Sequence, residues 1–242
     1  MATSEVGLAQ RRMWRATGNW IAKLKDYPGW REWNRSRIGH TFYFDDKFAR
    51  SPESLGDFQF DYQTELEHSV VTRYLELLDA VASLRDIEWY FRRYPFTGTS
   101  VTRYTHLTHC CELYFGRFYQ FKERLKNLFD AVKVAVPDHG LDVGRLIKQF
   151  DRNFKDEILA RNTVHHRERF DDIAISRVFL TESILSAKSD PIERRVLQSR
   201  YRVVANEWTA RIRRRAKHLD AYVEAVAEAL LNACKFLDDS ER

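Results

Sequence analysis

The sequence predicts an all-α protein: an up-and-down helical bundle with an N-terminal aromatic extension and a long C-terminal helix. Apolar residues recur at spacings of three, four and seven over most of the chain, which is the period of amphipathic helices. The 242 residues include only nine Gly and five Pro, too few turn residues for many short strands. A hydrophobic fraction of 44% with 14% aromatic residues indicates a globular chain with a substantial core.

Residues 1–58 form the expected extension, which is basic and predicted to be irregular because Pro28-Gly29, Ser51-Pro52 and Gly56 interrupt it. Aromatic rings interleaved with arginines can stack on single-stranded RNA. Large aromatic side chains more often pack in cores and interfaces, and we favour packing on the bundle. The rings in question are Trp14, Trp20, Trp30 and Trp33.

Residues 59–190 are expected to form the bundle itself. Periodic apolar stripes predict helices over about 60–93, from there to about 135, over 142–161 and over 171–187. Thr99 or Ser100 is expected to cap the second helix, and Asp171 and Asp172 begin the fourth.

Residues 191–242 are expected to form the final helix. Ser189-Asp190-Pro191 is a strong start signal, because a capping side chain precedes a proline at the first helical position. The apolar period then continues for about 45 residues, or roughly 70 Å. So long a helix should pack on the bundle or on a partner chain.

The cysteines and the N-terminus bear on the compartment. Cys110 and Cys111 are adjacent and cannot easily bridge each other, which favours a reducing compartment. The first ten residues lack the apolar run of a signal peptide, and no stretch is apolar enough to span a membrane. We expect a cytoplasmic protein that does not engage membranes.

No cofactor and no metal are predicted. His106 and Cys110 are four residues apart and could share a metal ion, but a second ligand pair at a characteristic spacing is missing from the sequence. We take the buried cysteines as small hydrophobic residues.

The segment Arg161-Asn162-Thr163-Val164-His165-His166 carries the most specific chemistry in the sequence. A histidine can take the 2'-hydroxyl proton of RNA or protonate the leaving 5'-oxygen. The fixed fork of donors on an arginine can hold the charged phosphoryl oxygens. This pair of residue types is what metal-free cleavage of RNA requires.

Which histidine acts with Arg161 depends on whether the helix breaks or continues after this residue. Arg161 and His166 are five residues apart, about 140° around an unbroken helix, so they converge only if the helix breaks near Asn162. If the helix continues, His165 lies one turn beyond Arg161 on the same face. A purely structural alternative is that Arg161 caps the helix and both histidines are solvated.

This segment resembles the Arg-x4-6-His motif of the HEPN superfamily, and Arg161, Asn162 and His166 match its common form Arg-Asn-x3-His. The preceding run Tyr119-Gln120-Phe121-Lys122-Glu123-Arg124-Leu125-Lys126 is also similar to bacterial members, so the resemblance covers roughly 60–190. It implies a helical-bundle homodimer with a composite RNase site that leaves a 2',3'-cyclic phosphate and a 5'-hydroxyl. It also implies a role in toxin-antitoxin or phage-defence systems, with an antitoxin or nucleotidyltransferase partner.

The basic run Arg211, Arg213, Arg214 and Arg215 on the last helix is the predicted RNA-binding stripe, with a solvated helix face as the alternative. The leading functional prediction is therefore a HEPN-type endoribonuclease, with His166 as the general acid/base and Arg161 binding the phosphate and the transition state. In this prediction the helix breaks at Asn162, which orients the backbone of the break. The alternatives are a non-catalytic dimeric module that binds RNA, a nucleotide or a partner protein, and a coiled-coil dimer built on the last helix.

Overall fold

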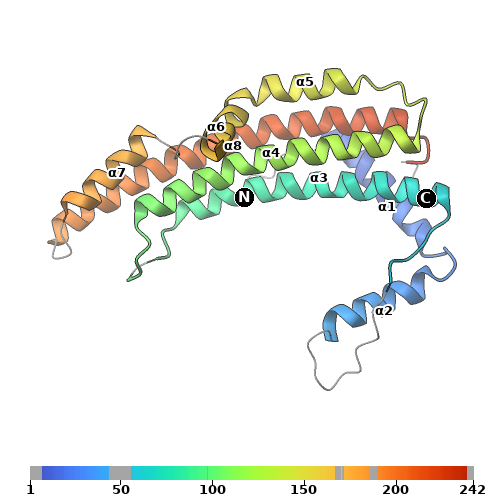
Figure 1. Ribbon diagram of the computed structural model, residues 1–242, viewed down its shortest axis with the longest axis horizontal. Coiled ribbons are helices and arrows are strands. Elements are labelled where there is room, and N and C mark those ends of the chain that lie inside the picture. Colours follow the sequence, from blue (N-terminus) through green and yellow to red (C-terminus); the bar gives the residue numbers. More distant parts are fainter. Residues whose placement is uncertain are drawn as a thin grey trace. The chain divides into compact units, whose positions relative to one another are not determined.

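The computed structural model describes residues 7–43, 56–96, 98–166, 170, 172–185 and 190–238, with the side chains of Tyr43 and residues 163–166 left undescribed. Every regular element in these ranges is an α-helix, so the all-α prediction is confirmed (Figure 1). No helix in the same ranges combines the length and apolar character that crossing a bilayer needs.

The chain divides into two compact units. Among the described residues, the first unit contains 73–130 and 142–223, and the second contains 7–72, 131–141 and 224–238.

The first unit is a bundle whose long helices lie side by side (Figure 1). Its core is rich in aromatic rings: Trp208 stacks on Phe91 with centroids 5.5 Å apart, and Tyr114 meets Trp208 edge-on at 5.7 Å. Burying such rings contributes most of the packing energy of a core. The unit is built from α3 (Tyr62–Arg92), α4 (Arg103–Ala135), α5 (Val143–Asn153), α6 (Lys155–His166), α7 (Ile173–Ile184) and α8 (Pro191–Ala233), of which α3, α4 and α8 also supply residues to the second unit.

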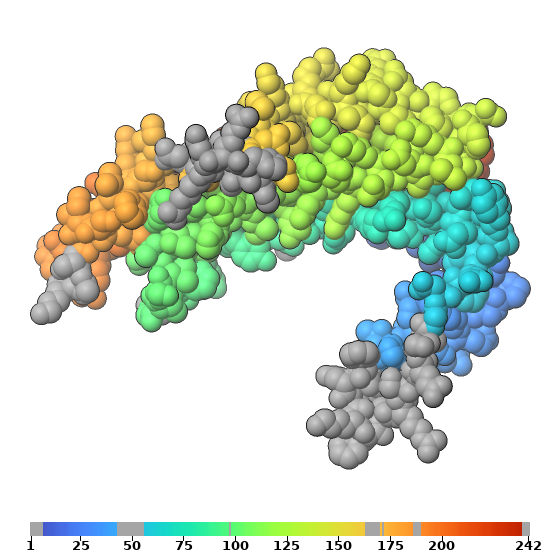
Figure 2. Space-filling model, viewed as in Figure 1, coloured from blue at the N-terminus to red at the C-terminus, as the bar shows by residue number. Residues whose placement is uncertain are grey.

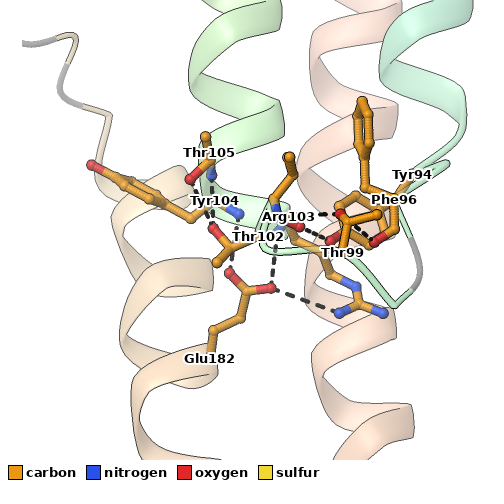
Figure 3. A network of polar contacts seen from close by, with 9 residues as sticks. Tyr94, Phe96, Thr99, Thr102, Arg103, Tyr104, Thr105 and Glu182 are labelled. Carbon is orange, nitrogen blue, oxygen red and sulfur yellow. Dashed lines mark hydrogen bonds and ion pairs between the residues drawn. The ribbon is translucent and has the colours of Figure 1, made fainter.

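The N-terminus of α4 is capped differently from the prediction. Thr102, not Thr99 or Ser100, accepts from the backbone N–H of Thr105 at 3.0 Å. The hydroxyl of Thr99 is used in the preceding turn, where it donates to the carbonyl of Phe96. Glu182 of α7 adds a second cap, because its two carboxylate oxygens accept from the backbone N–H groups of Arg103 and Tyr104 at 2.9 and 3.1 Å (Figure 3).

The single helix predicted over 142–161 is wrong, because it is two helices separated at Phe154. Phe154 leaves the helical region with φ −122° and ψ 27°, and its ring is fully buried. Asp156 and Glu157, which follow Lys155, bring negative charge to the first turn of α6, where it suits the helix dipole. The apolar stripe alone did not reveal this break.

The start signals of α7 and α8 are as expected. The carboxylate of Asp172 accepts from the backbone N–H groups of Ala174 and Ile175. Asp190 does the same for Ile192 and Glu193, and α8 then runs unbroken for 43 residues. Asp171 and Ser189 lie outside the described residues.

The second unit contains α1 (Leu8–Leu24) and α2 (Trp30–Tyr43), so the prediction of an irregular extension over residues 1–58 is wrong for these two segments. The predicted interruption at Pro28-Gly29 is present, since Gly29 has a positive φ of 77° that separates the helices. The buried residues of α1 recur at helical spacing, and this spacing is the signal that could have predicted the helix. They are Ala9, Met13, Ala16, Thr17, Trp20 and Leu24.

Most of the tryptophans of the second unit pack within it. Trp20 is buried and donates its indole N–H to Glu67 at 2.9 Å, and Trp30 stacks on Trp33 at 5.3 Å. Phe58 and Phe60 complete the cluster around Trp30. These contacts agree with the packing alternative, whereas Trp14 is 65% exposed.

Candidate functional site

A buried carboxylate, Glu157, lies in the first turn of α6. Only 2% of its surface is exposed, and it accepts hydrogen bonds from Arg215 at 2.5 Å and from the hydroxyl of Tyr114 at 3.3 Å. A guanidinium nitrogen of Arg211 lies 3.7 Å away. Burial, and then the charge of Glu157, raises the pKa of Tyr114 well above its usual value. Two arginines of α8 therefore neutralise a carboxylate that water cannot solvate.

Arg215 also fixes the break between α5 and α6. Its guanidinium donates to the carbonyl of Asn153 at 2.6 Å, and that carbonyl lies at the end of α5, where it lacks a helical partner. The same group lies over the ring of Phe154, 4.8 Å from its centroid. Arg215 thus caps one helix and pairs with the first turn of the next.

Arg161 lies one turn beyond Glu157 on α6, and the residue is half-buried. The guanidinium carbon lies 3.8 Å from the centroid of Tyr119 on α4, a cation–π contact. One of its nitrogens donates to the side-chain oxygen of Asn162 at 3.2 Å. These two contacts orient the guanidinium at the carboxyl end of the helix.

The expected helix break at Asn162 is wrong, because α6 continues through residue 162 to His166. Asn162 hydrogen bonds to Arg161 instead of ending the helix. On the continuous helix, position 165 lies about 40° around the axis from Arg161 and position 166 about 140°. The side chains of His165 and His166 lie outside the described residues, so their contacts are left unassigned.

Most of the predicted RNA-binding stripe on α8 is engaged inside the protein. Arg213 forms two hydrogen bonds with Glu88, at 2.9 and 2.8 Å, and these bonds are the main reason that the pKa of Glu88 is lowered. Arg211 lies over the ring of Trp208 at 4.8 Å as well as beside Glu157. Arg214 is exposed and has no ion-pair partner among the described residues. RNA binding by these arginines stays a prediction.

His106 and Cys110 are together as their spacing suggested, with the sulfur 3.7 Å from Nε2. Nε2 lies 2.9 Å from the carbonyl of Tyr90, which can only accept, so this nitrogen carries the proton. Burial lowers the pKa of His106 and raises the pKa of Cys110 to about 12. The described part of the chain contains no group of three His, Cys, Asp or Glu residues suited to a metal ion.

Sequence reasoning missed two residues of this region, Glu157 and Tyr119. Glu157 precedes Arg161 by four residues, so the helical period already put them on one face. Tyr119 belongs to the run 119–126, but no local pattern could link it to a helix about 40 residues later.

Comparisons with protein-family models, with curated proteins and with solved structures found no match. The HEPN resemblance therefore remains one of motif and helical context, carried by Arg161, Asn162 and His166.

Proposed function

We propose that this chain is a metal-independent endoribonuclease of the HEPN type, in which Arg161 binds the scissile phosphate and a neighbouring histidine transfers the proton. The observation that carries the proposal is the continuity of α6 up to His166. Residues four apart on a helix are neighbours on its surface, so His165 is the histidine we assign to Arg161 of the same chain.

The proposed reaction needs an acid, a base and a stabilising charge. An imidazole removes the proton of a ribose 2'-hydroxyl, and that oxygen attacks the adjacent phosphorus. The bond to the 5'-oxygen breaks, and a second imidazole protonates the leaving oxygen. In the homodimer that the resemblance implies, the second copy supplies this acid. Arg161 stabilises the charge on the phosphoryl oxygens, and the products are a 2',3'-cyclic phosphate and a 5'-hydroxyl.

The contacts of Arg161 suit this role. A guanidinium held against the ring of Tyr119 loses less conformational freedom when it binds a phosphate than a freely rotating side chain would. Asn162 acts here as a positioning residue, since its side chain accepts from the guanidinium. Two orienting groups therefore support one phosphate-binding group.

The test is RNA cleavage by the purified chain in the presence of EDTA, with the ends of the products identified. Arg161→Ala and His165→Ala should each slow cleavage by about 100- to 10,000-fold. Arg202→Ala is the matched control, because Arg202 is an exposed arginine of the same unit outside the predicted RNA-binding run, and it should cut at the wild-type rate. If His166→Ala abolishes cleavage while His165→Ala does not, the assignment of the histidine within the chain is overturned.

A second candidate function is a non-catalytic helical module that binds RNA, a nucleotide or a partner protein. The observation that favours it is that Arg161 already contacts Tyr119 and Asn162, as a purely structural arginine would. In that case wild-type protein leaves every RNA intact, and Arg161→Ala lowers the melting temperature without any change in RNA chemistry.

A further inference from the structure

The outer face of α5 carries a row of cations. Arg145, Lys148 and Arg152 follow one another at spacings of three and four, so they share one side of the helix, and all three are exposed. Figure 2 shows α5, in yellow, at the surface of the first unit. We call these three residues the α5 stripe.

The α5 stripe lines a hollow in the surface. An open groove of about 670 Å³ runs along it, and the other described residues on its walls are Asp142, Gly144 and Gln149. Gln149 adds an amide that can both donate and accept hydrogen bonds. The described lining of the groove therefore combines three cations, one neutral polar group and one carboxylate.

The three cations of this groove form no ion pairs with carboxylates of the described chain. The carboxylate of Asp142 is already used, since it accepts from the backbone N–H of Arg145 at 2.8 Å and caps α5. The nearby Asp151 is paired with Lys122 of α4 at 2.6 Å. A polyanion would therefore meet a surface on which three cations outnumber the single carboxylate of Asp142.

The other side of α5 is anchored to the bundle. Phe150 is fully buried and stacks on Phe121 of α4 at 5.1 Å. The hydroxyl of Tyr222 on α8 donates to the carbonyl of Leu146 at 2.9 Å. Because the inner face is held in this way, the three cations stand on a rigid support, which lowers the entropic cost of binding.

We propose that the α5 stripe is a phosphate-binding surface for single-stranded RNA. The proposal deepens the proposed function and rests on it for the identity of the polyanion. Along the helix axis the cations are separated by about 4.5 and 6 Å, so each can reach a different phosphate of one strand.

A membrane surface fits this face less well. A helix that lies on a bilayer inserts exposed apolar side chains, and none of the large exposed apolar residues of the described chain belongs to α5. The apolar side of α5 is occupied by contacts with Phe121 and Tyr222 instead.

The experiment measures binding of the full chain to a fluorescein-labelled oligo(U) RNA by anisotropy, over a range of salt concentrations. Arg145→Gln, Lys148→Gln and Arg152→Gln are combined in one variant. Loss of three phosphate contacts should lower the slope of log affinity against log salt by about 2, with an affinity at least about tenfold weaker in low salt.

The matched control combines Arg194→Gln, Arg195→Gln and Arg202→Gln on α8, three exposed arginines of the same unit without a partner in the described chain. It removes the same charge and should keep the wild-type slope. An equal loss of slope in both variants, or in neither, overturns the proposal. Circular dichroism melts check that both variants are folded.

Two further measurements, of membrane binding and of RNA cleavage, test the α5 stripe separately from a membrane surface and from the proposed function. Flotation with vesicles of phosphatidylserine and phosphatidylcholine should show no binding, and stripe-dependent flotation without RNA binding would overturn the assignment to RNA. If the wild type binds RNA through the stripe but never cuts it, the proposed function fails and the stripe stands. If the stripe variant binds and cuts as the wild type does, the stripe fails and the proposed function stands.

Discussion

Two basic helix faces of the first unit differ in what their charges do. On α8, Arg215 and Arg211 neutralise the buried Glu157, and Arg213 pairs with Glu88 through two hydrogen bonds. On α5, the three cations of the stripe have no carboxylate partner among the described residues. The first face holds the bundle together, and the second faces a groove.

The density of cations along a sequence therefore does not predict the charge that is available to a ligand. Residues 211–215 contain the densest basic run on the last helix, yet tertiary contacts satisfy three of its four arginines. The cations of α5 are spread at helical spacing, which looks unremarkable in the sequence but produces a single exposed row.

The largest expected effect tests the basic face of α8, whose arginines pair with carboxylates. Glu157→Gln leaves Arg215 and Arg211 without their carboxylate in a poorly solvated site, so the free energy of unfolding should fall by about 3 kcal/mol. Urea unfolding followed by circular dichroism measures it.

Asp156→Asn is the control for this variant, because Asp156 is an exposed acid of the same helical turn, and its loss should cost less than about 1 kcal/mol. Equal losses in the two variants would show that the contacts of Glu157 add nothing beyond the helix dipole.

A smaller effect is expected at Glu88, whose pKa is lowered chiefly by the hydrogen bonds from Arg213. A carboxylate with a lowered pKa stabilises the fold above its ordinary pKa of 4.5, and the stabilisation is lost as the pH falls through the lowered value. At neutral pH, Glu88→Gln should unfold about 1 kcal/mol more easily than the wild type, because Arg213 is 57% exposed and solvent screens the pair.

In acid the free energies of unfolding of Glu88→Gln and the wild type should converge. Denaturation at a series of pH values measures the difference between them. Glu207→Gln, a change at an exposed glutamate of α8, is the control for the loss of one carboxylate charge at neutral pH. A gap that persists in strong acid would mean that Glu88 contributes through packing and not through its charge.

The sequence allowed the long helices to be predicted because their signals are local. The start of α8 at Pro191 follows from Asp190, and the limits of α3 and α4 follow from apolar periodicity interrupted by Pro95, Gly98 and Pro137. The break at Phe154 could not be predicted in the same way. Its supporting contacts come from Arg215, about 60 residues later in the chain.

The candidate site was predictable as a set of residue types but not as a geometry. Arg161 and Asn162 were identified from their motif, whereas the choice between His165 and His166 depended on whether α6 ends at Asn162. That outcome depends on how far packing sustains the last turn, and weak local preferences for Asn, Thr and Val do not decide it.

The smallest expected effect tests the α5 stripe. Substituting Gln at Arg145, Lys148 and Arg152 together should change the free energy of unfolding by less than about 0.5 kcal/mol, because the stripe makes no described ion pair and Gln has nearly the same helix propensity. The sign should be a slight stabilisation in low salt, since like charges three and four residues apart repel each other by about 0.2 to 0.5 kcal/mol per pair. High salt should erase this gain by screening the repulsion. Urea unfolding at two salt concentrations makes the measurement. A loss of more than about 1 kcal/mol would mean that these cations are held by carboxylates after all, and the α5 stripe would then resemble the paired face of α8 instead of differing from it.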